Sequence, residues 1–219
     1  MPTNSQLPET LKNDLDYFIS QGVTILEAPR IVPFLPPSRQ DRSQSSVGKD
    51  AFVSQDKLFK YLLESERAIP HLIGFYEDPF CHPTTTFPHL PFITRSASLV
   101  LELRDGLHGF HGTVHGGFIC AVMDEAMGSL IVLNDILNRQ AKAKGIIPTD
   151  TKKFTAAVTA YMDVKYRKPI STPQIVVVTA SLDRIEGRKM YMHVVVKDQH
   201  NHECVSCDGM FISVPTGKL

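Results

Sequence analysis

Apolar and polar positions recur with different periods along the chain, and these periods predict its helices and strands. Residues 117–133 are apolar nearly all round and too many for one strand, so a buried helix is predicted there. The segments after it are rich in Val, Ile, Thr and Tyr and are separated by short polar connections, which is typical of strands. Four such strands are predicted, at residues 155–166, 174–185, 189–197 and 203–214.

The fold class follows from how these elements can cover one another. Residues 97–103 predict a further strand, and residues 108–117 contain four glycines and three histidines, which indicates a loop. Connections as short as residues 186–188 join antiparallel strands, because parallel strands need long crossovers. A helix that is apolar all round has to be covered all round. The sequence therefore predicts an α+β fold in which an antiparallel sheet, ending in a meander of four strands, curls around one central helix.

The first 70 residues have a different pattern. Residues 1–70 are predicted to form a partly helical N-terminal arm that packs on a domain comprising residues 71–219. Two helices are expected in the arm, at residues 11–20 and 54–67. Ser54 would be the N-cap of the second helix, and repeated prolines between the two predict loop or extended chain. Residues 134–154 are polar and contain Gly and Pro, so the central helix is expected to end soon after 117–133.

Length, charge and cysteine content limit the class of protein. The chain has 219 residues, with 23 Lys plus Arg against 23 Asp plus Glu, which argues against a strongly cationic nucleic-acid binder. No apolar run reaches the roughly 18 residues of a membrane span, and the N-terminus lacks the pattern of a secretory signal or a transit peptide. The four cysteines form no disulfide framework, so a reducing compartment is expected, the cytosol or an organelle matrix.

Two carboxylates lie in the middle of the predicted buried helix, Asp124 and Glu125, and a buried carboxylate is costly unless it is paired. One interpretation is structural: one faces a sheet edge or solvent and the other caps a loop. The other is catalytic, because His115-Gly116-Gly117 stands at the N-terminus of the same helix. Amides in a first helical turn can bind developing negative charge, as in an oxyanion hole, although these glycines also fit a plain tight turn.

The spacing between these two groups bears on assembly. Asp124 lies seven residues beyond Gly117, which is about 10 Å along a helix. Reacting atoms approach within roughly 3 Å, so Asp124 cannot reach a carbonyl bound at the N-terminus of its own helix. If both groups act on one substrate, they come from different chains. The spacing therefore predicts a dimer with two sites across its interface.

Other residues admit two interpretations each. Thr159 shares a strand face with small residues, as a site beside the helix needs, but Thr is also a common strand residue. Arg188 and Lys189, which follow Gly187, could be ordinary turn charges. The sharper interpretation is a cationic trio around a phosphate-rich ligand, formed by Arg167, Lys168 and Arg188. Cys204 and Cys207 lie three apart in a predicted strand and would face opposite sides. No second CxxC supports zinc, so no metal site is predicted.

The stretch GTVHGGFICAVMDEAMG resembles the signature of the PaaI-type hotdog-fold acyl-CoA thioesterases, in which HGG leads into the central helix and an Asp follows nine positions after the His. Farther on, VTAYMDVKYRKPI and RIEGRKMYMHVVV resemble the group of that superfamily that contains the mitochondrial long-chain enzymes and their fungal relatives. The resemblance covers residues 95–214. It implies a hotdog fold, hydrolysis of a medium- or long-chain acyl-CoA, and a cytoplasmic or mitochondrial location.

The resemblance also implies roles for individual residues. The Gly116 amide, presented by His115 and Gly117, would bind the thioester oxygen. Asp124 would act as base for water or as nucleophile, and Thr159 would help to hold the water or the carboxylate within the same subunit. Residues implied to bind the substrate are Gly117, His108, His111, Arg167, Lys168, Arg188 and Lys189.

Two departures from the family pattern affect this site. His108 stands where the family often has Asn, seven positions before the His of HGG. The span from Asp124 to Thr159 is long, which predicts an insertion at residues 134–154 that lines or covers the acyl tunnel or is merely solvated. The depth of the acyl cavity would be set by residues such as Phe118, Met123 and Met127.

The resulting prediction is an acyl-CoA thioesterase that forms a homodimer or a dimer of dimers and uses no metal or redox cofactor. Two alternatives stay open. A hotdog hydratase or dehydratase usually carries a His beside the acid on the helix, and residues 117–133 contain none. A non-catalytic acyl-CoA sensor, or a scaffold that binds a protein through the arm, would keep the fold without turnover, but the joint presence of Asp124, Thr159 and Lys189 argues against it.

Overall fold

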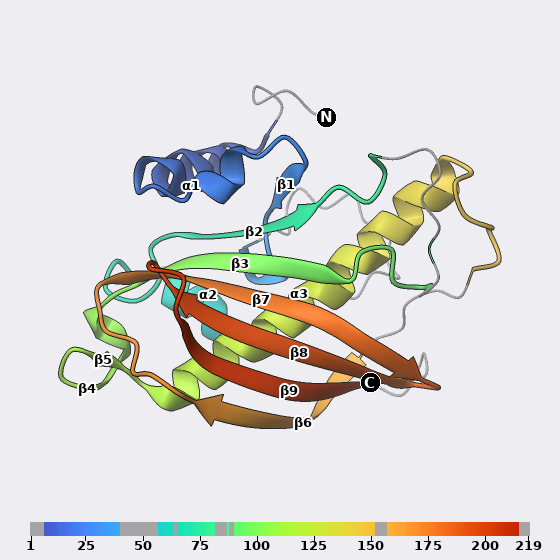
Figure 1. Ribbon diagram of the computed structural model, residues 1–219. Coiled ribbons are helices and arrows are strands. Elements are labelled where there is room, and N and C mark those ends of the chain that lie inside the picture. Colours follow the sequence, from blue (N-terminus) through green and yellow to red (C-terminus); the bar gives the residue numbers. More distant parts are fainter. Residues whose placement is uncertain are drawn as a thin grey trace.

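Seven antiparallel strands and one long helix form the core of the computed structural model, which describes residues 7–39, 57–63, 65–81, 87, 90–151 and 157–214. Their order in the sheet is β1-β2-β3-β7-β8-β9-β6, and helix α3 (Gly116–Ala143) lies across one face (Figure 1). The strands are β1 (Ile31–Phe34), β2 (Leu72–Glu77), β3 (Ser96–Leu103), β6 (Ala157–Tyr166), β7 (Gln174–Glu186), β8 (Lys189–Asp198) and β9 (Glu203–Ser213). This architecture confirms the predicted α+β hotdog fold.

The sheet order corrects the predicted meander of four strands. Strands β7, β8 and β9 follow one another as predicted, but β6 pairs with β9 at the edge of the sheet and not with β7. Before α3, the glycine-rich segment forms a small hairpin of β4 (His108–Phe110) and β5 (Thr113–Val114). The N–H of Val114 donates to the carbonyl oxygen of Ile170 at 2.9 Å. The chain after β6 is therefore held at this hairpin before it returns to the sheet as β7.

The arm contributes helix α1 (Glu9–Ser20), helix α2 (Lys57–Leu63) and the edge strand β1. Strand β1 was not predicted, because Pro33 argued for loop, but an edge strand tolerates proline. It pairs with β2, where Gly74 leaves room for the ring of Phe34. Helix α2 is shorter than the predicted 54–67, and its predicted N-cap Ser54 lies outside the described residues.

Helices α1 and α3 cover opposite faces of the sheet. The buried apolar side chains of α1 are Leu11, Leu15 and Phe18. They pack on Ile73 and Val100 of the outer face, whereas the larger apolar cluster lies on the α3 side. Asp14, also on the buried side of α1, accepts hydrogen bonds from the guanidinium of Arg39 and lies 2.7 Å from His71 Nδ1. A nearly inaccessible carboxylate is thus fully paired, as burial requires.

Helix α3 continues ten residues beyond the predicted segment 117–133. The prediction of an early loop was wrong because two of the polar residues that suggested it, Asn134 and Asn138, are buried and bonded to the backbone of a distant segment. The side-chain oxygen of Asn134 accepts from the N–H groups of Ile93 and Thr94 at 2.7 and 2.9 Å. The first ten residues of the predicted insertion at 134–154 are therefore helix, and its last three residues lie outside the described part of the chain.

One side of α3 is left open by its own chain, contrary to the expectation of complete coverage. Gly117, Ala121, Asp124 and Gly128 on this side are exposed or half-buried, and we call these four residues the open strip. A methyl group added at Gly128 would meet no described heavy atom within 4 Å. By length and composition α3 could also cross a membrane, but half of its most apolar window is buried inside the protein, as in a core helix.

Candidate active site

The N-terminus of α3 is built by the hairpin and capped by His115. His115 Nδ1 accepts a hydrogen bond from the Gly117 N–H at 3.0 Å, so this ring nitrogen is unprotonated in that arrangement. The hairpin closes against the cap at Gly109, where a Cβ atom would come within 2.9 Å of His115 Cα. The bridge between Thr113 and Ser171 ties the other side of the hairpin to the chain after β6. The first turn of α3 therefore has a fixed place in the fold.

The amide of Gly116 is the candidate oxyanion donor. The N–H groups of Phe118 and Ile119 both donate to the carbonyl oxygen of His115, at 3.0 and 3.3 Å, and the Gly117 N–H is bonded to the His115 ring. Within the described part of the chain, no acceptor takes the Gly116 N–H. A first-turn amide in this position, at the positive end of the helix macrodipole, can receive the oxygen of a polarised carbonyl.

Asp124 and Thr159 come together across the edge of the sheet. Thr159 in β6 donates its hydroxyl proton to Asp124 Oδ1 at 2.5 Å. The register of β6 against β9 shifts between Thr159 and Tyr161, so a bulge lies beside this contact. The neighbouring Glu125 accepts from the hydroxyl of Ser38 in the arm at 2.7 Å. The two adjacent carboxylates thus have different surroundings, and Asp124 is the one on the open strip.

The oxyanion donor and the carboxylate are far apart within one chain. Asp124 follows Gly116 by eight residues on a continuous helix, which separates the two positions by about 12 Å. A reacting carbon has to lie roughly 3 Å from its attacking group, so one chain cannot bring both groups to the same carbonyl. The distance in the structure therefore agrees with the inference from the sequence: if both groups act on one substrate, they come from different chains.

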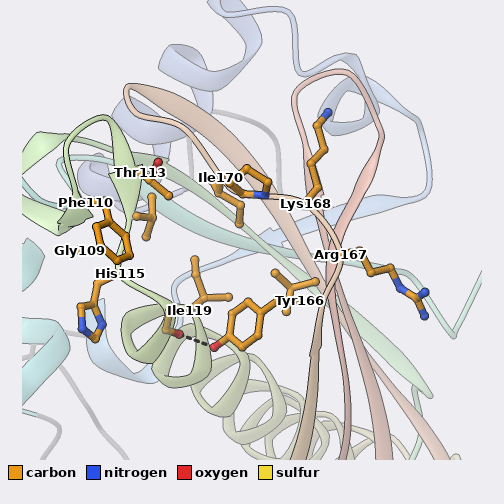
Figure 2. Close-up of a pocket in the computed structure, with 13 residues that line it drawn as sticks. Gly109, Phe110, Thr113, His115, Ile119, Tyr166, Arg167, Lys168 and Ile170 are labelled. Atoms are coloured by element: carbon orange, nitrogen blue, oxygen red, sulfur yellow. Dashed lines mark hydrogen bonds between the residues drawn. The ribbon is translucent and has the colours of Figure 1, made fainter.

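A cavity of about 470 Å³ opens beside the N-terminus of α3 (Figure 2). Its walls are mainly apolar and include Phe110, Ile119 and Ile170. Tyr166 lies opposite the hairpin and donates its hydroxyl proton to the carbonyl oxygen of Gly116 at 2.6 Å. The cavity therefore borders the candidate oxyanion donor directly.

Two of the predicted phosphate-binding cations stand at the rim of this cavity, but each has an anionic partner in its own chain. Arg167 pairs with Glu203 at 2.7 Å, and Lys168 pairs with Asp198 at 3.0 Å. Figure 2 shows both side chains pointing away from His115. A phosphate would have to compete with these carboxylates or share the cations with them.

Asp198 is a nearly inaccessible carboxylate at the turn between β8 and β9. Burial by itself raises the pKa of Asp198, but hydrogen bonds from the N–H of His202 and from the Lys168 ammonium outweigh it and hold the pKa well below its usual range. The N–H of His200 also donates to this carboxylate, at 2.9 Å. Asp198 is therefore ionised at neutral pH and fixes the position of the Lys168 ammonium.

Arg188 and Lys189 lie at the opposite end of the sheet. The Arg188 carbonyl oxygen accepts from the N–H of Ser213, whereas the residue after β6, Arg167, bonds to Cys204 at the start of β9. These two ends of β9 are about 30 Å apart at the usual rise per strand residue. The predicted cationic trio is therefore not a cluster within one chain, because Arg167 and Lys168 precede β7 and Arg188 follows it, at the other end of that strand.

His108 and His111 do not line the cavity. A ring nitrogen of His108 is hydrogen-bonded to the hydroxyl of Thr172, and His111 is exposed near the tip of the hairpin. Cys204 and Cys207, predicted to face opposite sides, are both buried in the main apolar cluster, because a register shift lies next to Cys204. The roles predicted for the two histidines stay predictions.

Comparison with known proteins identifies the family. A model of the thioesterase superfamily matches residues 111–205, from the hairpin into β9. Verlamelin biosynthesis protein B of a Lecanicillium species is 32% identical over 163 residues, which are 66% of this chain and 67% of that protein. The chain belongs to the thioesterase superfamily. The predicted family membership is thereby confirmed.

Other members of the thioesterase superfamily match a smaller part of their own length or of this chain. Acyl-coenzyme A thioesterase THEM4 of Mus musculus is 31% identical over 96 residues, 43% of this chain and 33% of the mouse protein. The chain thus spans about a third of that relative. Among solved structures, the E. coli PaaI protein from the phenylacetic acid degradation operon aligns with a TM-score of 0.43 and 12% identity, over 54% of this chain and 72% of that one.

In this member of the superfamily, sequence reasoning missed two residues that border the cavity or its rim. Tyr166 belongs to the segment YRKP that carried the family resemblance, but nothing in the pattern indicated its contact with Gly116, 50 positions away. Asp198 stood in a connection that was described only as polar. The local signal that could have indicated Asp198 is its place at the start of a turn that also contains His200 and His202.

Proposed function

We propose that this chain hydrolyses medium- or long-chain acyl-CoA to a free fatty acid and coenzyme A, at two sites across the interface of a homodimer. The observation that carries the proposal is the hydrogen bond between Thr159 and Asp124 on the open strip, about 12 Å along the helix from the Gly116 amide. Family membership supports thioester hydrolysis as the reaction class, and the mouse relative bears the name of an acyl-CoA thioesterase.

Each group has a part in the reaction. The Gly116 N–H donates to the thioester oxygen and stabilises the negative charge that develops on it. In one route, Asp124 takes a proton from water while the water oxygen attacks the carbonyl carbon. In the other, an Asp124 oxygen attacks the same carbon, and water then opens the resulting anhydride. In both, the C–S bond breaks and coenzyme A leaves as a thiolate that takes up a proton, while the Thr159 hydroxyl fixes the carboxylate.

The edge strand β6 supports the homodimer. It is the last strand of the sheet, and its large exposed apolar side chains are Val158, Tyr161 and Tyr166. A free strand edge with apolar side chains is a template for pairing with another chain. Pairing two copies of β6 about a two-fold axis would bring the two α3 helices side by side in opposite directions. Asp124 of one copy would then face Gly116 of the other.

The open strip is the feature that supports a medium- or long-chain acyl group as substrate. Beyond Asp124 it continues with Gly128, and the next half-buried residue on that side is Val132. The small side chains would leave room along α3 for a hydrocarbon chain, which burial against this side would stabilise. Met123 and Met127, predicted to set the depth of the cavity, are completely buried against the sheet and so do not belong to the open strip.

The test is release of thiol from a panel of acyl-CoAs with chains of two to eighteen carbons. The expected result is turnover of medium or long chains, and a fall in kcat of at least about a hundredfold in Asp124→Asn, the scale of a lost base or nucleophile. The matched control is Asp163→Asn, a largely exposed carboxylate on the same edge strand β6, which should keep wild-type turnover.

Three outcomes decide between this proposal and its rivals. Preference for chains of two to four carbons would overturn the medium- or long-chain assignment alone. Equal loss in Asp124→Asn and Asp163→Asn would show that the effect is not specific to the site. No turnover of any substrate, with acyl-CoA still raising the Tm of the protein, would replace hydrolysis by a binding function.

A further inference from the structure

Tyr166 at the end of β6 contacts the first turn of α3 in two ways. Its hydroxyl donates to the Gly116 carbonyl oxygen at 2.6 Å (Figure 2). The same hydroxyl lies 3.0 Å from Cys120 Sγ, one helical turn farther on. The ring also closes over Gly116, because a Cβ atom there would come within 3.3 Å of the hydroxyl oxygen. The residue as a whole is 53% exposed in the single chain, so about half of its surface is covered by these contacts and by its neighbours.

The peptide group between Gly116 and Gly117 is held at both ends. Tyr166 binds its carbonyl oxygen at 2.6 Å, and His115 Nδ1 accepts from its N–H at 3.0 Å. A peptide group is planar, so two anchors on opposite sides fix its orientation. Glycine at position 116 would otherwise leave the adjoining dihedral angles unusually free. The Gly116 N–H belongs to the preceding peptide group, so fixing the Gly116–Gly117 peptide also restricts the direction of this N–H.

The direction of the proton in this chain of bonds follows from the donors present. A phenol has one proton, and Tyr166 gives it to the Gly116 carbonyl oxygen, so the Cys120 thiol is the donor to the Tyr166 oxygen. Burial of the hydroxyl raises the pKa of Tyr166 to about 12. Tyr166 thus keeps its proton, and remains a donor, throughout the neutral and mildly alkaline range.

We propose that Tyr166 is a positioning residue that holds the Gly116 N–H in the direction needed by the thioester oxygen, with Cys120 orienting the Tyr166 hydroxyl. This inference rests on the proposed function, because it assigns the Gly116 amide to the oxyanion. Tyr166 acts through Gly116 and touches no reacting atom. Its hydroxyl therefore affects the stabilisation of the transition state more than the binding of substrate.

The first measurement is kcat and KM for Tyr166→Phe, which removes only the hydroxyl. Deleting an oxyanion donor costs about a hundredfold or more in kcat, and loosening one costs less. The expected result is a fall in kcat of about tenfold with KM within about twofold of the wild type. The matched control is Tyr61→Phe, an exposed tyrosine on helix α2 of the arm, which should change neither constant.

The second measurement reports the peptide itself and needs no turnover. Amide hydrogen exchange of Gly117 is expected to be faster in Tyr166→Phe than in the wild type, because one of the two anchors is gone. Cys120→Ala should show a weaker form of both effects. The double variant should be no worse than Tyr166→Phe alone, because both side chains act through one bond.

The outcomes separate this inference from the proposed function. Unchanged kcat and unchanged Gly117 exchange in Tyr166→Phe would overturn the positioning role. A rise in KM at constant kcat would also overturn it, because Tyr166 would then contact the substrate. Absence of turnover in the wild-type protein would instead overturn the proposed function, and the exchange measurement would still show whether Tyr166 fixes the Gly116–Gly117 peptide.

Discussion

The two sides of α3 differ in what they require of their residues. Side chains that pack completely against the sheet include Met123, Met127 and Leu130. The open strip, in contrast, consists of small residues and one carboxylate and is exposed or half-buried. The buried side is constrained by shape, because close-packed interiors tolerate little change in volume. The open strip is constrained by chemistry, so substitutions on the two sides should separate loss of stability from loss of turnover.

The largest effect on stability is expected on the buried side, for Leu130→Ala. Leu130 is fully buried, and its truncation should lower the free energy of unfolding by about 3 kcal/mol, through lost burial and the cavity left behind. Urea denaturation measures this difference. The matched change on the open side is Val132→Ala, which is half-buried and should cost less than about 1 kcal/mol. Equal losses would show that a partner or the arm buries both sides alike.

Introducing a charge on the edge strand β6 tests whether a second copy of the chain pairs with this strand and covers the open strip. In Val158→Arg, a guanidinium should prevent two β6 edges from pairing, because charged edges resist strand addition. Light scattering should then give the mass of one chain, and kcat should fall by at least about a hundredfold, because a misplaced catalytic group costs that much. Lys165→Arg keeps a charge already present on β6 and serves as the control. A monomer with full turnover would rule out sites shared between chains.

A smaller effect on turnover is expected for Thr159→Ala. The lost hydrogen bond to the Asp124 carboxylate should reduce kcat by about tenfold, in line with a bond to a charged group. The free energy of unfolding should change by less than about 0.5 kcal/mol, because Thr159 is exposed. Thr159→Ser keeps the hydroxyl and should restore most of the turnover. A loss of stability that parallels the loss of kcat would assign Thr159 to the fold.

The parts of the fold that could be predicted are those specified by local pattern. Inward residues of β7 alternate strictly, and the apolar run from Gly117 indicates the buried helix without knowledge of its partners. The end of α3 could not be predicted, because Asn134 is paired with the backbone of residues 93 and 94, far away in sequence. Strand β1 could not be predicted because Pro33 is acceptable only in an edge strand, and which strand lies at the edge depends on the order of the whole sheet.

The candidate site divides in the same way. His115-Gly116-Gly117 and Asp124 stand out in the sequence, because glycines at a helix start and a carboxylate in an apolar helix are each unusual. The grouping of Arg188 with Arg167 failed within one chain, because β7 lies between the two residues and carries the chain to the other end of the sheet. Contacts such as Tyr166 with Gly116 depend on where β6 lies in the strand order and could not be derived from spacing.

The smallest expected effect is that of changing Asp198 at the rim of the cavity. Asp198 stabilises the turn between β8 and β9 and also pairs with Lys168, a cation that borders the candidate site. The pKa of Asp198 is lower in the folded protein than the usual value near 4 in an unfolded chain, so the folded state binds this proton less readily. A carboxylate of this kind stabilises the fold above about pH 4, and its contribution is lost as the pH falls below that value.

Asp198→Asn should therefore lower the free energy of unfolding by about 1–2 kcal/mol at pH 7, the worth of a hydrogen bond to a charged group. The difference from the wild type should shrink steadily as the pH falls from 5 to 2, which urea denaturation at a series of pH values can follow. Asp163→Asn, at a largely exposed carboxylate, should show little difference at any pH. A difference for Asp198→Asn that stays constant with pH would mean that its charge is not what holds Lys168 and the turn, and that the shape of the side chain suffices.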